Sequence, residues 1–195
     1  RAAQRVPSLR FFHSERSYML DRTLVVVDMQ NDFVYGPLGN EECRSAVKDV
    51  VDVITNGGFG LIVVTIDTHY EDYLSTQEGI RIPVEHCIEG TEGWELVPDV
   101  ECALEESGVE VVTVRKGVFG SVDLPGIIAS RCKEDAEVYF VGVCTDICVV
   151  SNAVMLRSVC PEMRLAVISR ACAGSSRQRH EAALDTMRSC QIDVV

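Results

Sequence analysis

The chain has 195 residues, of which 47% are hydrophobic and 25% charged, so it suits one domain with a sizeable core. Its net charge of −12 argues against nucleic acid as a partner, because phosphate binding requires clustered lysine and arginine. No apolar run approaches the roughly 18 residues that span a bilayer, so we expect no membrane partner either.

The first 20 residues differ in composition from the rest of the chain. Residues 1–14 carry three arginines and no acidic residue, which fits a targeting presequence, a strand-swapping tail or a plain arm. We predict a plain N-terminal arm over residues 1–20 and one domain over residues 21–195. The nine cysteines are scattered and form no C-x-x-C pair, which indicates a reducing compartment. We therefore expect a cytoplasmic protein, with organellar targeting by the arm left open.

Short runs of valine, isoleucine and leucine alternate with helical patterns from residue 23 onward. The predicted strands are 23–28, 61–66, 109–114, 138–143, 164–169 and 191–195. The predicted helices are 41–56, 94–107, 124–133, 146–159 and 176–190. Near-continuous apolar strands that alternate with helices are typical of a parallel sheet covered on both faces. The sequence therefore predicts a three-layer α/β/α domain with a mainly parallel six-stranded sheet.

The first three predicted strands each lead into a charged residue. Asp28 ends the first strand, Asp67 follows the second, and Lys116 follows the third. In open parallel sheets ligands bind outside the carboxyl ends of the strands, so we expect these groups at one edge. Each has a structural alternative, because a carboxylate there can cap a turn and a lysine can be solvated. Strand alternation puts Lys116 and Arg115 on opposite sides.

The fourth predicted strand leads into a turn that contains two cysteines. Thr145 or Asp146 is a natural N-cap, which would place Cys148 in the first turn of the next helix. Unpaired N–H groups and the helix dipole there favour a thiolate and could hold an oxyanion. A neighbouring lysine would lower the thiol pKa, and a neighbouring carboxylate could take its proton. The alternative is that Cys144 and Cys148 are small buried hydrophobes.

The long irregular stretch over residues 67–93 contains oxygen and imidazole groups. Asp67 and His69 are one residue apart at a strand end, and Glu78 and His86 follow. Such ligands suit zinc, iron or manganese. In the alternative reading His69 caps a turn, His86 bonds a carbonyl and Glu78 is solvated. No G-x-G-x-x-G follows a strand and no Walker A sequence occurs, so we expect no nucleotide cofactor.

Several of these segments resemble the isochorismatase-like cysteine hydrolases, a family that includes the nicotinamidases. The resemblance covers residues 22–195 and is carried by VVVDMQNDFV at 25–34, DTH at 67–69, PVEHCIEGTEGWEL at 83–96, RKGVFGSVDL at 115–124 and GVCTDICVVSNAVML at 142–156. It implies a triad of Asp28, Lys116 and Cys148. It also implies an oxyanion hole from the Cys144 and Cys148 amides, with a cis peptide bond between Val143 and Cys144.

The same resemblance implies a metal and substrate contacts. Asp67, His69 and His86 fall on metal-ligand positions, and Glu78 matches a fourth ligand of some members. The implied substrate contacts are Phe33, Gln30 and Ile82. Family members are commonly dimers or tetramers, so a homo-oligomer is implied as well.

Residues and resemblance together predict a cysteine-dependent, nicotinamidase-like amidohydrolase that acts on a small carboxamide. The expected reaction passes through a thioester and releases ammonia, with a divalent zinc, iron or manganese ion as the cofactor. One alternative is a hydrolase of a carbamoyl or ureido compound, or of isochorismate, on the same scaffold. Another is a non-catalytic redox or metal-binding protein, in which Cys144 and Cys148 form a reversible pair.

Overall fold

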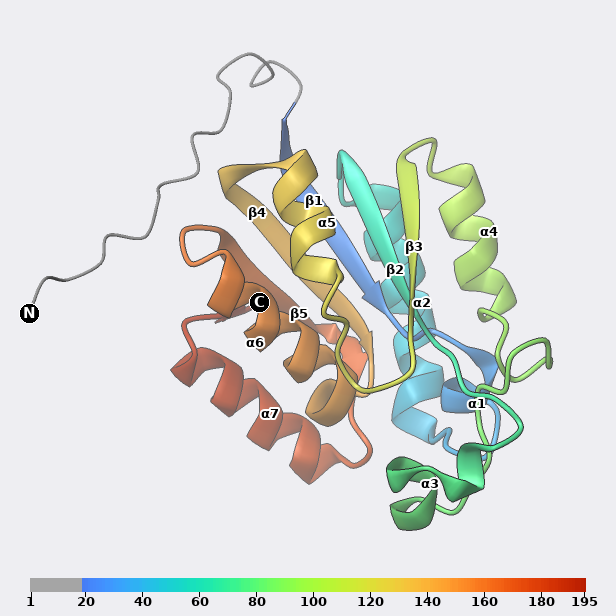
Figure 1. Cartoon of the computed structure of the whole chain (residues 1–195). Coiled ribbons are helices and arrows are strands. Elements are labelled where there is room, and N and C mark those ends of the chain that lie inside the picture. Colours follow the sequence, from blue (N-terminus) through green and yellow to red (C-terminus); the bar gives the residue numbers. More distant parts are fainter. Residues whose placement is uncertain (1–18) are drawn as a thin grey trace, which may run out of the picture.

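The computed structural model describes residues 19–195, which contain a six-stranded sheet in the order β3-β2-β1-β4-β5-β6 (Figure 1). Every neighbouring pair of strands is parallel. The strands are β1 (Leu20–Val27), β2 (Leu61–Asp67), β3 (Glu110–Lys116), β4 (Cys132–Val143), β5 (Arg164–Ala173) and β6 (Asp193–Val194). The α/β fold expected from the alternating pattern is confirmed.

Helices cover both faces of the sheet and give three layers (Figure 1). Helices α2 and α4 pack on one face, and α5, α6 and α7 on the other. Short helices lie in the loops near the carboxyl ends of the strands. The helices are α1 (Asn31–Val34), α2 (Glu41–Asn56), α3 (Gln77–Arg81), α4 (Pro98–Glu106), α5 (Leu124–Arg131), α6 (Val150–Val159) and α7 (Arg177–Ser189).

Some element boundaries differ from the prediction. Strand β4 begins at Cys132, six residues before the predicted start, because its backbone pairs with β1 although residues 132–137 carry no apolar run. Helix α4 begins at Pro98 rather than at residue 94, since proline suits the first helical position. Helices α1 and α3 were not predicted, because four or five residues are too few to show a helical period.

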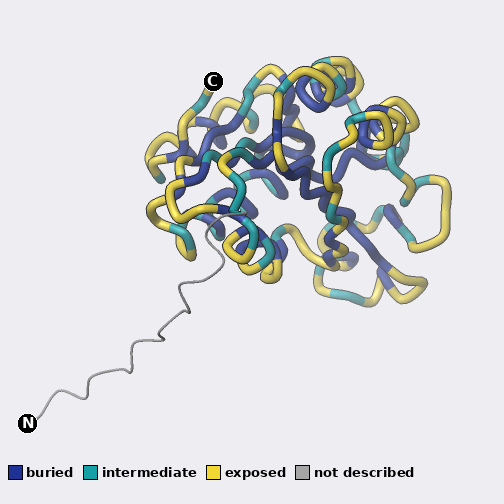
Figure 2. Tube along the Cα trace, turned by 90° about the horizontal axis from the view of Figure 1, so that it is seen from above, coloured by how far each residue is buried: buried dark blue, intermediate teal, exposed yellow. Residues whose placement is uncertain are grey.

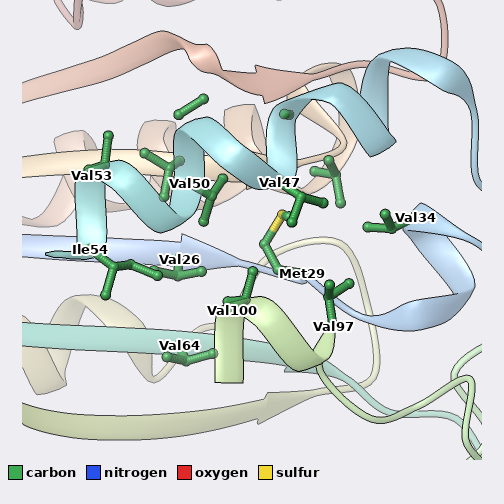
Figure 3. Close-up of a cluster of buried hydrophobic side chains, with 14 of the residues drawn as sticks. Val26, Met29, Val34, Val47, Val50, Val53, Ile54, Val64, Val97 and Val100 are labelled. Atoms are coloured by element: carbon green, nitrogen blue, oxygen red, sulfur yellow. The ribbon is translucent and has the colours of Figure 1, made fainter. Parts of the chain in front are cut away.

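Alternation along the central strands divides the core into two clusters. Val26 and Val64 face α2 and α4 and pack there against Val47 and Val50 (Figure 3). Leu24 belongs to the same cluster. Burial of each such side chain stabilises the fold by about 1.5–3 kcal/mol. Figure 2 shows the buried segments through the middle of the molecule and the exposed ones around it. The sheet is therefore fixed from both faces, and its carboxyl edge is a rigid base for the loops.

The predicted N-terminal arm lies outside the described residues except for Met19 and Leu20, and Leu20 is already the first residue of β1. Between residues 19 and 195, no helix has both the length and the hydropathy needed to cross a membrane. The cytoplasmic location and the homo-oligomer stay predictions.

Gly142 in β4 occupies a position that excludes any side chain. Its φ is 114°, and a Cβ added there would lie 2.1 Å from the Val27 carbonyl oxygen of β1. We expect Gly142→Ala to lower the free energy of unfolding by about 3 kcal/mol, through backbone strain and the clash with β1. Urea unfolding followed by circular dichroism measures this change.

The matched control is Gly126→Ala in α5, where an added Cβ meets nothing within 4 Å. There alanine should raise the free energy of unfolding by about 0.5–1 kcal/mol, because it favours the helix. Equal effects at both positions would contradict the steric argument.

Candidate active site

Four neighbouring strands end at the same edge of the sheet and bring charged groups together there. Asp28 follows β1, Asp67 ends β2 and Lys116 ends β3. The Lys116 Nζ lies 2.6 Å from Asp28 Oδ2 and 3.1 Å from Asp67 Oδ1. It also lies 3.7 Å from the Sγ of Cys148, in the turn after β4. All four side chains are buried, so these charges interact with little screening by water.

Asp28 is held in an uncommon backbone conformation. Its φ is 50°, in the left-handed region that aspartate tolerates better than most residues, and such outliers cluster at functional sites. Oδ1 accepts a hydrogen bond of 2.6 Å from the Thr65 hydroxyl. Oδ2 faces Lys116 and has no well-aligned hydrogen-bond donor among residues 19–195. Burial raises the pKa of Asp28, and the Lys116 ammonium offsets part of that rise.

Lys116 remains an ammonium in spite of its burial. Burial acts to lower its pKa, but Asp28, Cys148 and Asp67 raise that pKa by more. Arg115 lies on the opposite side, as strand alternation predicted, where its guanidinium stacks on Trp94 and pairs with Glu89. Of the two adjacent cations, only Lys116 therefore reaches the buried site.

Cys148 lies in a single π-helical turn, Thr145–Val149, that precedes α6. The predicted N-cap was wrong, because Cys144 takes that position and its carbonyl accepts from the N–H groups of Ile147 and Val149 at 3.1 Å. Asp146 instead accepts two hydrogen bonds from Ser175, at 2.7 and 2.6 Å. The Val143–Cys144 peptide bond is cis, as the family resemblance implied.

The thiol of Cys148 is buried deeply enough to change its expected protonation. Burial raises its pKa, the nearby Asp28 carboxylate raises it further, and only Lys116 opposes them. Burial and the Asp28 carboxylate therefore favour the thiol at this position, whereas the helix start alone was expected to favour a thiolate. A protonated thiol needs a base during attack, and the Asp28 carboxylate lies in the same cluster.

Asp67 also forms, with two histidines, a buried cluster that has the donor types of a metal site. One ligand atom each from Asp67, His69 and His86 lies within 4.8 Å of the others. Nε2 of His69 and of His86 lie 3.1 and 3.7 Å from Asp67 Oδ2. His86 Nδ1 lies 2.8 Å from the Val84 carbonyl, which leaves Nε2 directed at the cluster. Two imidazoles and a carboxylate fit a divalent ion such as zinc, iron or manganese.

Glu78 of α3 stands beside this cluster as a candidate fourth ligand. Its Oε1 lies 3.9 Å from Nε2 of both His69 and His86. Burial raises its pKa, and Asp67 raises it further. Glu78 is partly buried, with only 14% of its side chain exposed, so it is not a freely solvated carboxylate.

Tyr73 packs against both imidazoles, and its place in this site was not predicted from the sequence. Its ring centroid lies 4.7 Å from that of His69 and 4.9 Å from that of His86, and its hydroxyl donates to the Ile82 carbonyl at 3.0 Å. Burial raises the pKa of Tyr73 to about 12, so the hydroxyl stays a donor. Nothing in the surrounding polar stretch distinguishes this tyrosine from the exposed Tyr70.

The residues implied as substrate contacts have different surroundings. Phe33 is buried, with its ring edge-on to His86 at 5.4 Å, and Ile82 is half-buried. The Gln30 amide donates to the Asp67 and Trp94 carbonyls at 2.9 and 2.8 Å and accepts from the Asp67 N–H at 2.7 Å. Both of its N–H groups are used, so Gln30 holds the end of β2 instead of offering a donor to substrate.

His180 of α7 lies beside the turn that contains Cys148. Its Nδ1 is 2.8 Å from the Thr145 hydroxyl, so it supports the turn that carries Cys148.

Comparison with known proteins identifies the family of this chain. Residues 22–195 match the family model of the isochorismatase domain. The nicotinamidase of Schizosaccharomyces pombe is 28% identical over an alignment that covers 88% of this chain and 91% of that relative.

Two solved structures share the fold over almost their whole length. The nicotinamidase/pyrazinamidase of Bacillus subtilis has a TM-score of 0.78 at 26% identity, covering 90% of this chain and 99% of that one. The pyrazinamidase of Pyrococcus horikoshii in complex with zinc has a TM-score of 0.72 at 28% identity, covering 90% and 98%. The chain therefore belongs to the isochorismatase family, as a nicotinamidase-like member.

Proposed function

We propose that this protein is an amidohydrolase that releases ammonia from a small carboxamide, with nicotinamide as the leading substrate. The observation that carries the proposal is the single buried ammonium of Lys116, which joins a carboxylate at 2.6 Å to a thiol at 3.7 Å. Relatives that are nicotinamidases or pyrazinamidases over nearly the whole chain support the choice of substrate class.

The reaction begins at Cys148, whose sulfur attacks the amide carbon while Asp28 takes the thiol proton. Lys116 keeps the carboxylate and the developing thiolate in place. The backbone N–H groups of Cys144 and Cys148 stabilise the tetrahedral oxyanion. Asp28 then returns the proton to the leaving nitrogen, the carbon–nitrogen bond breaks, and ammonia departs. Water hydrolyses the thioester, which gives the carboxylic acid and restores the thiol.

The cluster of Asp67, His69 and His86, with Glu78 beside it, would hold the metal. A bound divalent ion would supply a Lewis-acid anchor for a ring nitrogen or a water. Asp67 keeps one oxygen on Lys116 and directs the other at the imidazoles, and Tyr73 fixes the imidazole planes. Zinc is the first ion to test, because the Pyrococcus horikoshii relative binds it.

The direct test is ammonia release by the purified protein from nicotinamide, pyrazinamide, benzamide and an N-carbamoyl amino acid. We expect turnover of nicotinamide and pyrazinamide, with benzamide slower because it lacks a ring nitrogen. Turnover of the N-carbamoyl compound alone would replace this proposal by the carbamoyl hydrolase alternative. No turnover of any amide by the zinc-loaded protein would contradict the proposed function.

Removal of metal should lower activity without unfolding the domain. We expect a chelated sample to lose about 10-fold to 100-fold in kcat/KM for nicotinamide. The loss is limited because the metal would only orient the substrate, while Cys148 performs the attack. Zinc, iron(II) and manganese(II) are then added back separately, and bound metal is measured by mass spectrometry. His86→Ala should bind less metal and resist rescue. Full activity after verified metal removal would contradict a metal role.

A further inference from the structure

Asn152 connects the nucleophile turn to the loop that follows Lys116. It lies on α6, one turn after Cys148, and is fully buried. Its Nδ2 donates to the carbonyls of Cys148 at 2.8 Å and Phe119 at 3.3 Å. Its Oδ1 accepts from the Ser121 N–H at 2.9 Å. One side-chain amide therefore bonds backbone groups of two separate segments.

The loop at residues 117–123, between β3 and α5, is not held by its large apolar side chains. Val118, Phe119 and Val122 are 58%, 42% and 80% exposed. The loop approaches α6 through the backbone of a residue without a side chain, Gly120. A Cβ added to Gly120 would lie only 2.7 Å from Sδ of Met155 in α6. The attachment of this loop beside Cys148 thus depends strongly on the hydrogen bonds of Asn152.

The loop begins directly after Lys116, so its position affects the contact between Nζ and the sulfur. We infer that Asn152 is a positioning residue that sets the spacing between Lys116 and Cys148. The inference rests on the proposed function, in which Cys148 is the nucleophile. Asparagine is suited to this position because it offers two donors and an acceptor on one rigid group, whereas aspartate offers no donor and leucine offers neither.

The test compares Asn152→Asp and Asn152→Leu with the matched control Ser151→Ala. Ser151 is the adjacent residue, and its hydroxyl donates to the Ile147 carbonyl at 2.6 Å. The control therefore removes a hydrogen bond to the same turn and leaves both the Ser151 Cβ beside Gly120 and the hydrogen bonds of Asn152 to the loop at residues 117–123 in place. Each Asn152 variant should lower kcat for nicotinamide by about 30-fold with KM within about threefold, because misplaced reacting groups slow the chemical step. Ser151→Ala should stay within about threefold of the wild type.

Two readouts need no substrate and separate this inference from the proposed function. Amide hydrogen exchange at Ser121 should accelerate in both Asn152 variants and not in Ser151→Ala. Alkylation of Cys148 by iodoacetamide, followed by the mass of its peptide, should be at least about fivefold slower, because Lys116 no longer stabilises the thiolate from 3.7 Å.

The inference is overturned if folded Asn152→Asp and Asn152→Leu alkylate at the wild-type rate or faster. It is also overturned if Ser151→Ala shows the same losses. If the wild-type protein hydrolyses no amide but the exchange and alkylation results hold, the proposed function fails and the positioning role stands.

Discussion

Replacing Cys148 by alanine is expected to abolish amide hydrolysis, with a fall in kcat of about 10⁴-fold or more. The substitution removes the atom that forms the thioester, so neither Lys116 nor the oxyanion donors have a nucleophile to assist. Ammonia release from nicotinamide measures the loss. A covalent adduct on the Cys148 peptide, trapped at low pH from the wild-type protein and absent from the variant, identifies the thioester.

The matched control for this experiment is Cys172→Ala. Cys172 is another buried cysteine, on the neighbouring strand β5, and its thiol is not part of the Lys116 cluster. This variant should retain activity within about threefold, which separates loss of the nucleophile from a general effect of core cysteines. Substantial hydrolysis by a folded Cys148→Ala protein would rule out the cysteine mechanism.

Asp28→Asn should cause the second largest loss, with kcat lower by about 10³-fold. Asparagine has nearly the same shape and still accepts from Thr65 at Oδ1, but it cannot take the thiol proton. Its NH2 group would also face the Lys116 ammonium, so two hydrogen-bond donors would oppose each other there. We expect the free energy of unfolding to fall by about 1–3 kcal/mol and not more, because Asp67 still pairs with Lys116 at 3.1 Å.

Thr65→Val provides the comparison for the Asp28 variant. It removes the 2.6 Å hydrogen bond to Oδ1 and leaves the carboxylate in place. A loss within about tenfold in Thr65→Val, beside a loss of about 10³-fold in Asp28→Asn, would assign the effect to proton transfer. Similar losses in both variants would mean that Asp28 acts through geometry and is not the base.

The parts of the site that follow from strand patterns could be predicted from the sequence. Asp28, Asp67 and Lys116 each end an apolar run, and a parallel sheet brings such ends to one edge. Alternation alone distinguishes Lys116 from Arg115.

Features that depend on tertiary packing could not be predicted in this way. The raised pKa of Cys148 comes from its depth beneath neighbouring elements, which no local pattern encodes. Asp146 does not cap its own helix, because it is bonded to Ser175, 29 residues away in the chain. Gln30 and Tyr73 act through the carbonyls of Trp94 and Ile82, next to and within the long loop over residues 67–93, and that loop has no hydrophobic periodicity from which its path could be predicted.

The Asp67 carboxylate has a thermodynamic consequence, because its two oxygens serve two different clusters. Oδ1 lies 3.1 Å from Lys116, and Oδ2 lies 3.1 Å from His69. Charge added at the imidazoles therefore changes the field at the thiol, and the two sites share a coupling free energy. Coupling of this kind is reciprocal. If zinc shifts the equilibrium of a reversible modification of the Cys148 thiol by a certain factor, that modification must shift the affinity for zinc by the same factor.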